Sequence, residues 1–173
     1  SGTMFPTLAG AAGMNIHGKN NYAVGTLGDA IRSFDLVTPK GELLTCDRAT
    51  NADVFHAAIG GFGMLGSFTR IELETKRVHS GELEVRGISV PGLAEAMEEM
   101  DARTRDADYL VAWIDAFAGG AGLGRGLIHE ARYLAPGVEP NPERTLAVAH
   151  QELPPSILGV PKSEAWRALR LLN

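Results

Sequence analysis

A dense polar group lies in a glycine-rich stretch near the start of the chain. His17, Lys19 and Asn20 fall within the segment GMNIHGKN, residues 13–20. An imidazole can exchange a proton near neutral pH, and an ammonium group can hold or polarise an oxygen atom of a substrate. A single histidine is more often structural than catalytic, but the density of polar groups between glycines favours a functional site at His17 and Lys19.

A second glycine-rich motif follows later in the chain. Gly61, Gly63 and Gly66 have the GxGxxG spacing of the dinucleotide-binding fingerprint. That fingerprint needs a strand before the glycines and a helix after them, so that a pyrophosphate can bind at the start of the helix. Here a helical pattern comes first and a strand pattern follows, which argues against a Rossmann site. We expect the glycines to permit close backbone packing in a helix-to-strand turn and the close approach of a ligand.

Other patterns that carry chemistry are incomplete. The segment from Gly13 to Lys19 is close to a phosphate-binding loop, but Asn20 stands where that loop needs a serine or threonine to bind magnesium. Ser67 follows a glycine without the surrounding pattern of a serine-hydrolase nucleophile. No histidine pair has the spacing of zinc ligands, so no metal site is expected. The remaining histidines are interpreted as ordinary surface or core residues, namely His56, His79, His129 and His150.

The composition of the 173-residue chain argues against several classes of protein. Its 16 basic and 21 acidic residues give a net charge of −5 without a long basic run, so nucleic acid is not expected as a partner. No apolar stretch approaches the ~20 residues of a membrane span. The single cysteine, Cys46, permits no internal disulfide, and we expect a cytoplasmic protein. Met4 lies inside the sequence, which permits either a tagged protein or a piece of a longer one.

The elements that position these residues are clearest in the middle of the first half. Residues 1–30 are small and turn-rich, without periodicity for an ordinary helix or strand, so something else must order them. Apolar runs predict a hairpin over 31–46 with its turn at Pro39–Gly41. Asn51 is expected to cap a helix over 52–59, which the following glycines end. Period-two alternation then predicts a strand over 67–78.

The pattern changes near residue 78, which is the first candidate domain boundary. A strand is predicted over 81–90, and Pro91 is expected to open a helix whose apolar stripe contains Leu93, Met97 and Met100. Two further strands are predicted over 108–117 and 125–134, with Trp113 as a core residue. A proline-rich connection and a final helix over 162–173 complete the chain.

Several of these motifs, taken in order, resemble a known cofactor domain. Residues 1–46, with the block NADVFHAAIGGFGMLGSFTRIEL at 51–73, resemble the second half of the FAD-binding domain in the vanillyl-alcohol oxidase / p-cresol methylhydroxylase superfamily. Within it, HGKN at 17–20, AWIDA at 112–116 and LGRG at 123–126 are most similar to the decaprenylphosphoryl-ribose oxidase branch.

The resemblance implies an α+β fold, with the second FAD subdomain over residues 1–77 and the start of an antiparallel-sheet substrate-binding domain over 78–173. It also implies N- and C-terminal portions outside this sequence. His17 and Lys19 would face the substrate as catalytic and binding residues, with Trp113 near the same pocket. The positions that the resemblance assigns to FAD are Gly2, Thr3, Thr7, Leu8, Ala9, Gly10, Met14, Asn15, Ile16, His17, Ser67 and Phe68.

The expected function is that of an FAD-linked oxidase or dehydrogenase. The resemblance implies hydride transfer to flavin from a C–OH group of a sugar, polyol or related alcohol, while Lys19 and His17 hold or polarise the hydroxyl. The sequence also permits a non-catalytic ligand- or partner-binding module that retains the flavin fold.

Overall fold

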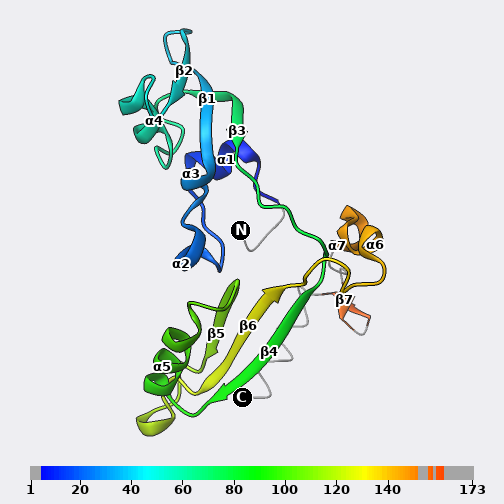
Figure 1. The fold of residues 1–173 in the computed structure, drawn as a ribbon. Coiled ribbons are helices and arrows are strands. Elements are labelled where there is room, and N and C mark those ends of the chain that lie inside the picture. Colours follow the sequence, from blue (N-terminus) through cyan, green and yellow to red (C-terminus); the bar gives the residue numbers. More distant parts are fainter. Residues whose placement is uncertain (1–4, 152–155, 158, 162–173) are drawn as a thin grey trace. The chain divides into compact units, whose positions relative to one another are not determined.

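The structure is a computed structural model that describes residues 5–151, 156–157 and 159–161. The described chain combines short helices with antiparallel strands, so it is α+β as expected (Figure 1). It forms two compact units. The first contains the described residues up to Arg77 together with Glu84–Arg132, and the second contains Val78–Leu83 and the described residues from Tyr133 onward. The domain boundary between residues 77 and 78 stays a prediction, and the predicted final helix lies outside the described residues.

A three-stranded antiparallel sheet forms within the first 77 residues. Strand β1 (Ile31–Val37) lies between β2 (Leu43–Asp47) and β3 (Ser67–Leu73) (Figure 1). The hairpin of β1 and β2 confirms the one predicted over 31–46. Gly41 has a φ of 81° in the turn, a conformation that glycine adopts without the steric cost of a Cβ atom.

Four short helices accompany this sheet. They are α1 (Leu8–Gly13), α2 (Asn21–Val24), α3 (Leu27–Ala30) and α4 (Ala52–Ala58). The prediction that residues 1–30 hold no ordinary element is therefore wrong for the described part. Helices α1 to α3 contain only four to six residues, which is too short for a repeating apolar stripe to reveal them.

Helix α4 confirms the helix predicted after Asn51, but the expected cap does not form. Asn51 is in the left-handed region with a φ of 48°, and its side chain makes no cap hydrogen bond. Its Nδ2 atom instead donates to the carbonyl oxygen of Thr45 at 2.8 Å. Asn51 thus joins the start of α4 to β2 rather than satisfying the free N–H groups of the helix.

The hydrophobic core of this region is built around Phe34 on β1. Its ring stacks on Phe55 of α4 at a centroid distance of 5.3 Å and meets Phe68 of β3 edge-on at 4.9 Å. Phe34 and Phe55 are fully buried together with Cys46 of β2. The core therefore joins all three strands to α4.

A second three-stranded sheet with one covering helix lies further along the chain. Its strands are β4 (Leu83–Val90), β5 (Tyr109–Ile114) and β6 (Gly126–Tyr133), in the order β4-β6-β5, and α5 spans Leu93–Arg103. The three predicted strands are confirmed. Helix α5 begins two residues after Pro91, with Gly92 as its N-cap, so Pro91 does not open it as predicted.

The buried face of α5 differs from the expected stripe. Ala96 packs with Val90 and Ile128, and Met100 lies against this cluster. Met97, predicted to belong to the apolar stripe, is 63% exposed. A small residue at the contact lets the helix backbone approach the sheet closely.

The β5–β6 connection is closed by Asp115. Its carboxylate accepts hydrogen bonds from the backbone N–H groups of Phe117 and Ala118, at 2.9 and 3.1 Å, and pairs with Arg125 at 2.9 Å. The pKa of Asp115 lies below its ordinary value. The hydrogen bond from the Phe117 N–H has the largest effect, and the bonds from Arg125 and Ala118 and the charge of Arg125 add to it. The short 3₁₀ helix η1 (Gly120–Gly122) lies in the connection.

The second unit is organised by a buried polar contact. Its elements are α6 (Pro142–Leu146), α7 (Val148–Gln151), β7 (Ser156–Ile157) and β8 (Val160–Pro161). Glu139 accepts hydrogen bonds from the hydroxyl groups of Ser80 and Thr145, both of which are buried. The Thr145 hydroxyl also accepts from the N–H of Gly81 at 3.1 Å, so α6 is joined to residues 80 and 81.

Truncation of the central ring tests the first core. We expect Phe34→Ala to lower the free energy of unfolding by about 3–5 kcal/mol, because it removes a fully buried aromatic side chain and leaves a cavity. Urea denaturation followed by circular dichroism measures the change. Leu43→Ala is the control, since Leu43 is 64% exposed on β2 and its truncation is expected to change stability by less than about 0.5 kcal/mol. Equal losses in both variants would contradict the assignment of the core.

The Asp115 contacts predict a pH dependence of local order. A carboxylate whose pKa is lowered on folding contributes stability above its unfolded pKa, ordinarily 3.8, and loses it as the pH falls through the folded-state pKa. We expect the amides of Phe117 and Ala118 to keep their exchange protection, corrected for intrinsic rates, between pH 7 and 5, and to lose it below the ordinary pKa. Asp115→Ala should abolish this step, and a persisting step would assign it to another group.

Candidate functional site

One cavity within residues 5–77 lies between α1 and the glycine turn, residues 60–66. We call it the glycine-turn pocket. It has a volume of about 400 Å³. Its lining consists of small and apolar residues from α1, the turn and the start of β3, namely Ala9, Gly10, Gly13, Met14, Phe62, Gly63, Gly66, Ser67 and Phe68.

Backbone hydrogen bonds fix the two walls of this pocket. The N–H of Gly60 donates to the carbonyl of Ala12 at 3.0 Å, and the N–H of Phe62 donates to the carbonyl of Gly13 at 2.9 Å. The order of elements confirms the reading of the GxGxxG spacing, because α4 precedes the glycines and β3 follows them. The turn is therefore a backbone-packing device that carries one wall of a cavity.

A second cavity of about 380 Å³ lies on another side of α1, and we call it the histidine pocket. Leu8 and Ala11 of α1 line it, whereas Ala9, Gly10 and Gly13 line the glycine-turn pocket. One short helix thus separates the two cavities. The other residues of the histidine pocket are Pro6, Ile16, His17, Gly18, Asn20, Val24, Gly25, Thr26 and Leu27.

The residues around His17 form a loop that is closed at its base. His17 pairs with Thr26 in an isolated antiparallel bridge, and the N–H of Leu27 donates to the carbonyl of Ile16 at 2.9 Å. Asp29 accepts hydrogen bonds from the N–H and the hydroxyl of Thr26, at 2.7 and 2.9 Å. The hydrogen bond from the Thr26 N–H, and to a smaller extent that from its hydroxyl, holds the pKa of Asp29 below its ordinary value. The base of the loop is therefore fixed, while His17 and Lys19 are exposed.

The structure brings Lys19 together with Trp113 of β5. The Lys19 Nζ atom lies 6.0 Å from the centre of the Trp113 ring, at the outer limit of a cation–π contact. The N–H of Leu110 donates to the carbonyl of Lys19 at 3.5 Å. Trp113 is 65% exposed, so the prediction that it is a core residue is wrong. Trp113 alternates with residues that face α5, which places it on the helix-free face of its sheet.

Two of the predicted cofactor residues have structural roles. The Thr7 hydroxyl caps α1 by accepting a hydrogen bond from the N–H of Gly10. Asn15 has a φ of 45°, and its Oδ1 atom accepts from the N–H of Gly28 at 2.8 Å. Asn15 lines neither of the two pockets, but a smaller cavity of about 160 Å³ with Arg48. The predicted residues Gly2 and Thr3 lie outside the described residues.

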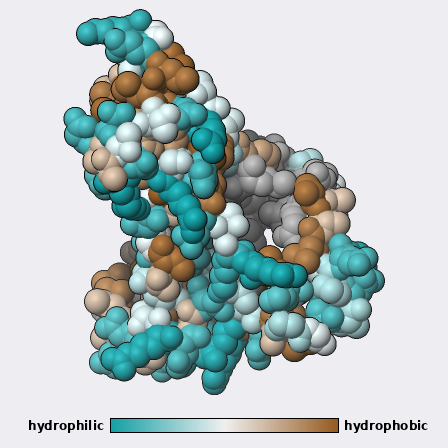
Figure 2. All heavy atoms as spheres, turned by 45° about the horizontal axis from the view of Figure 1, so that its top comes forward, coloured by the Kyte–Doolittle hydropathy of each residue, from teal (hydrophilic) through white to brown (hydrophobic). Residues whose placement is uncertain are grey.

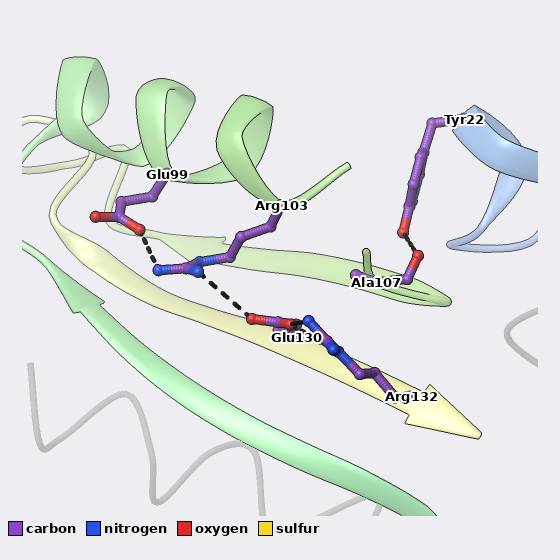
Figure 3. Close-up of polar contacts among 6 residues, drawn as sticks. All are labelled: Tyr22, Glu99, Arg103, Ala107, Glu130 and Arg132. Carbon is purple, nitrogen blue, oxygen red and sulfur yellow. Dashed lines mark hydrogen bonds and ion pairs between the residues drawn. The ribbon is translucent and has the colours of Figure 1, made fainter. Parts of the chain in front are cut away.

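The sequence interpretation missed a charged cluster at the end of α5. Glu130 of β6 is buried, and its carboxylate accepts from Arg132 at 2.7 Å and pairs with Arg103 of α5 at 3.6 Å (Figure 3). Arg103 also pairs with Glu99. Ile128, Glu130 and Arg132 alternate along β6 toward one face. In the sequence, the cluster is indicated by Glu130 and Arg132, which follow Ile128 at every second position. The same alternation of charges is common on exposed strands, so it does not identify a buried cluster.

Within the described ranges, no helix is both long and apolar enough to cross a membrane. In the same ranges, no group of three or more His, Cys, Asp or Glu side chains could hold a metal ion.

Comparison with known proteins identifies several relatives, although no protein-family model matches the chain. It is 33% identical over 129 residues to decaprenylphosphoryl-beta-D-ribose oxidase of Mycolicibacterium smegmatis, covering 73% of this chain and 28% of that protein. It is 30% identical over 163 residues to an uncharacterized protein in the mprA 5′ region of Streptomyces coelicolor, covering 88% and 43%. It is 32% identical over 82 residues to cytokinin dehydrogenase 3 of Arabidopsis thaliana, covering 46% and 16%.

The chain spans less than half the length of each of these relatives. A match of 129 residues must nevertheless include residues on both sides of position 77. The order of motifs in residues 7–73 and these similarities point to the same family. Over the part that it spans, the chain is a relative of the FAD-linked oxidases, which include decaprenylphosphoryl-ribose oxidase and the cytokinin dehydrogenases.

Proposed function

We propose that the protein containing this chain is an FAD-dependent oxidoreductase that oxidises a C–OH group of a sugar, a polyol or a related alcohol. Residues 1–77 would form the second subdomain of a p-cresol methylhydroxylase-type FAD-binding domain. Residues 78–173 would begin the substrate-binding domain. The observation that carries the proposal is the glycine-turn pocket, which gathers the predicted cofactor residues Ala9, Gly10, Met14, Ser67 and Phe68.

The chemistry of the glycine-turn pocket fits part of a bound flavin cofactor. Four of its nine lining residues are glycines and the others are small or apolar, which allows close approach of a large planar or phosphate-bearing group. Gly63 has a φ of 73°, and a Cβ atom there would meet no other atom within 4 Å. The absence of a side chain at Gly63 therefore leaves open space in the pocket.

The histidine pocket contains Leu8 and Ile16, which the resemblance assigns to FAD, and His17, which it assigns to both FAD and substrate. The flavin would therefore meet the substrate there, with Lys19 and Trp113 on the substrate side. Bound FAD would supply the hydride acceptor, and the chain's own residues would orient the alcohol. The Lys19 ammonium group can donate a hydrogen bond to the hydroxyl oxygen, which holds the oxygen at a fixed position. His17, which lines the histidine pocket, would donate a hydrogen bond to the substrate hydroxyl or accept its proton. The Trp113 ring offers an apolar surface beside Lys19.

The choice of an alcohol substrate is supported by comparing the matches to the ribose oxidase and to cytokinin dehydrogenase 3. The match to the ribose oxidase covers 73% of the chain, whereas that to cytokinin dehydrogenase 3 covers 46%. Anaerobic mixing of the purified full-length protein with a panel of sugars, polyols and cytokinins tests this choice. Bleaching of the flavin band at about 450 nm by an alcohol is expected. Bleaching by cytokinins alone would replace the proposed substrate class.

A variant that fills the glycine-turn pocket tests the cofactor site. Ala9→Leu places a larger side chain in the pocket from a helix position that tolerates leucine. We expect FAD to bind on the order of tenfold more weakly or worse, because overpacking costs about 1–3 kcal/mol. The measurement is FAD retention by absorbance after gel filtration and titration of the apoprotein. Ala57→Leu makes the same change at an exposed position of α4 and should bind FAD normally. Normal binding by Ala9→Leu would remove this pocket from the cofactor site.

Removal of the Lys19 ammonium group tests the substrate side. We expect Lys19→Ala to slow flavin reduction by the alcohol substrate roughly 10- to 100-fold, the value of a hydrogen bond to a charged group. FAD affinity should be unchanged. Stopped-flow absorbance measures the reduction, and FAD titration measures the binding. Equal loss of both would contradict the role assigned to Lys19, and a protein without flavin would favour the non-catalytic alternative.

A further inference from the structure

The loop that carries Lys19 has little packing of its own. Residues 17–26 are closed at their base by the pairing of His17 with Thr26, but α2 at the tip contains no buried residue. A segment of this kind opens readily unless a contact at its tip restrains it. The position of the Lys19 side chain therefore depends on what holds the tip.

One side chain of α2 reaches the connection between α5 and β5. The Tyr22 hydroxyl donates a hydrogen bond to the carbonyl oxygen of Ala107 at 2.8 Å, across 85 positions of sequence (Figure 3). Ala107 is a well-fixed acceptor. It is only 6% exposed, and its N–H donates to the carbonyl of Arg103 at 3.1 Å. The N–H of Asp108 donates to the carbonyl of Ala131 at 3.0 Å, which fixes the same segment to β6.

The surroundings keep the Tyr22 hydroxyl in its protonated, hydrogen-donating form. Partial burial raises the pKa of Tyr22, and the nearby charges of Asp108 and Glu130 raise it further. Glu130 is itself held in place by Arg103 and Arg132, as Figure 3 shows. The fixed charge of Glu130 thus favours the donor state of Tyr22.

Lys19 and Tyr22 contact the same strand region from the same loop. The carbonyl of Lys19 accepts from the N–H of Leu110, and its ammonium group lies 6.0 Å from the Trp113 ring. The Leu110 bond is long, at 3.5 Å, whereas the Tyr22 bond is short. We propose that Tyr22 is a positioning residue, which fixes the tip of the loop to Ala107 and so holds Lys19 beside Trp113. The consequence for catalysis rests on the proposed function, whereas the tether itself does not.

Hydrogen exchange of the full-length protein tests the tether without substrate. Tyr22→Phe keeps the ring and removes only the hydroxyl. We expect amides in residues 18–25 to exchange roughly three- to tenfold faster, the fold-change that corresponds to loss of one net hydrogen bond. Amides of β1 and β3 should be unchanged. Tyr133→Phe removes the same group from the last residue of β6 and should leave residues 18–25 unchanged. Unchanged exchange of residues 18–25 in Tyr22→Phe would overturn the tether.

A double-mutant cycle tests whether Tyr22 acts through Lys19. In the FAD-bound protein, Tyr22→Phe should slow flavin reduction by the alcohol substrate roughly three- to tenfold without changing FAD affinity. In a Lys19→Ala background the same substitution should have no further effect, because the group that it positions is absent. An equal effect in both backgrounds would overturn the positioning role. If the protein binds no flavin, the proposed function fails, while the exchange experiment still decides whether Tyr22 is a tether.

Discussion

The geometry of the candidate site depends on the close backbone contact between α1 and the glycine turn. Residues 12 and 13 are joined to residues 60 and 62 by two hydrogen bonds across about fifty positions of sequence. The contact needs glycine where the chain doubles back, because a Cβ atom at Gly61 would lie 2.3 Å from the carbonyl oxygen of Ala57. At Gly66 it would lie 2.2 Å from that of Val37. Larger residues at these positions would force the turn away from α4 and β1, and the two backbone bonds to residues 12 and 13 depend on its present course.

The fold could be predicted from the sequence where elements are long enough to show a period. The strands of both sheets, α4 and α5 each carry alternation, an apolar run or a helical stripe over six or more residues, apart from the five-residue β2, which its turn revealed. Helices α1 to α3 could not be found in this way, because their ends are set by local contacts such as the Thr7 cap and the Thr26–Asp29 pair. Asn51 shows the same limit. Its side chain could cap α4 or bond to Thr45, and only the neighbouring strand decides between them.

The candidate site could be predicted as a set of residues but not as an arrangement. Glycine spacing and the HGKN segment indicate close backbone approach and a polar group, which are local properties. The contact between Lys19 and Trp113 joins residues 94 positions apart, so it follows from tertiary structure alone. The same is true of Tyr22 and Glu130, whose partners lie on other elements. Such groups have no distinctive local sequence pattern, because any tyrosine on a short helix or glutamate on a strand looks the same.

The places where large apolar side chains are exposed also indicate which surfaces of this chain contact a ligand or another part of the protein. Folding favours burial of apolar surface at about 25 cal/mol per Å², so large exposed apolar groups that gather in one region indicate a surface that contacts something else. Phe62, Met64 and Met14 are all more than half exposed around the glycine-turn pocket. On the second sheet, Ile128 is fully buried beneath α5, whereas Trp113 on the helix-free face is largely exposed. Figure 2 shows hydrophobic residues, in brown, at the surface on the face in view. The face of the sheet under α5 buries its apolar side chains, so the sheet as a whole is well packed. The exposure of Trp113 is therefore specific to the opposite face, which is the face expected to contact a ligand or another part of the protein.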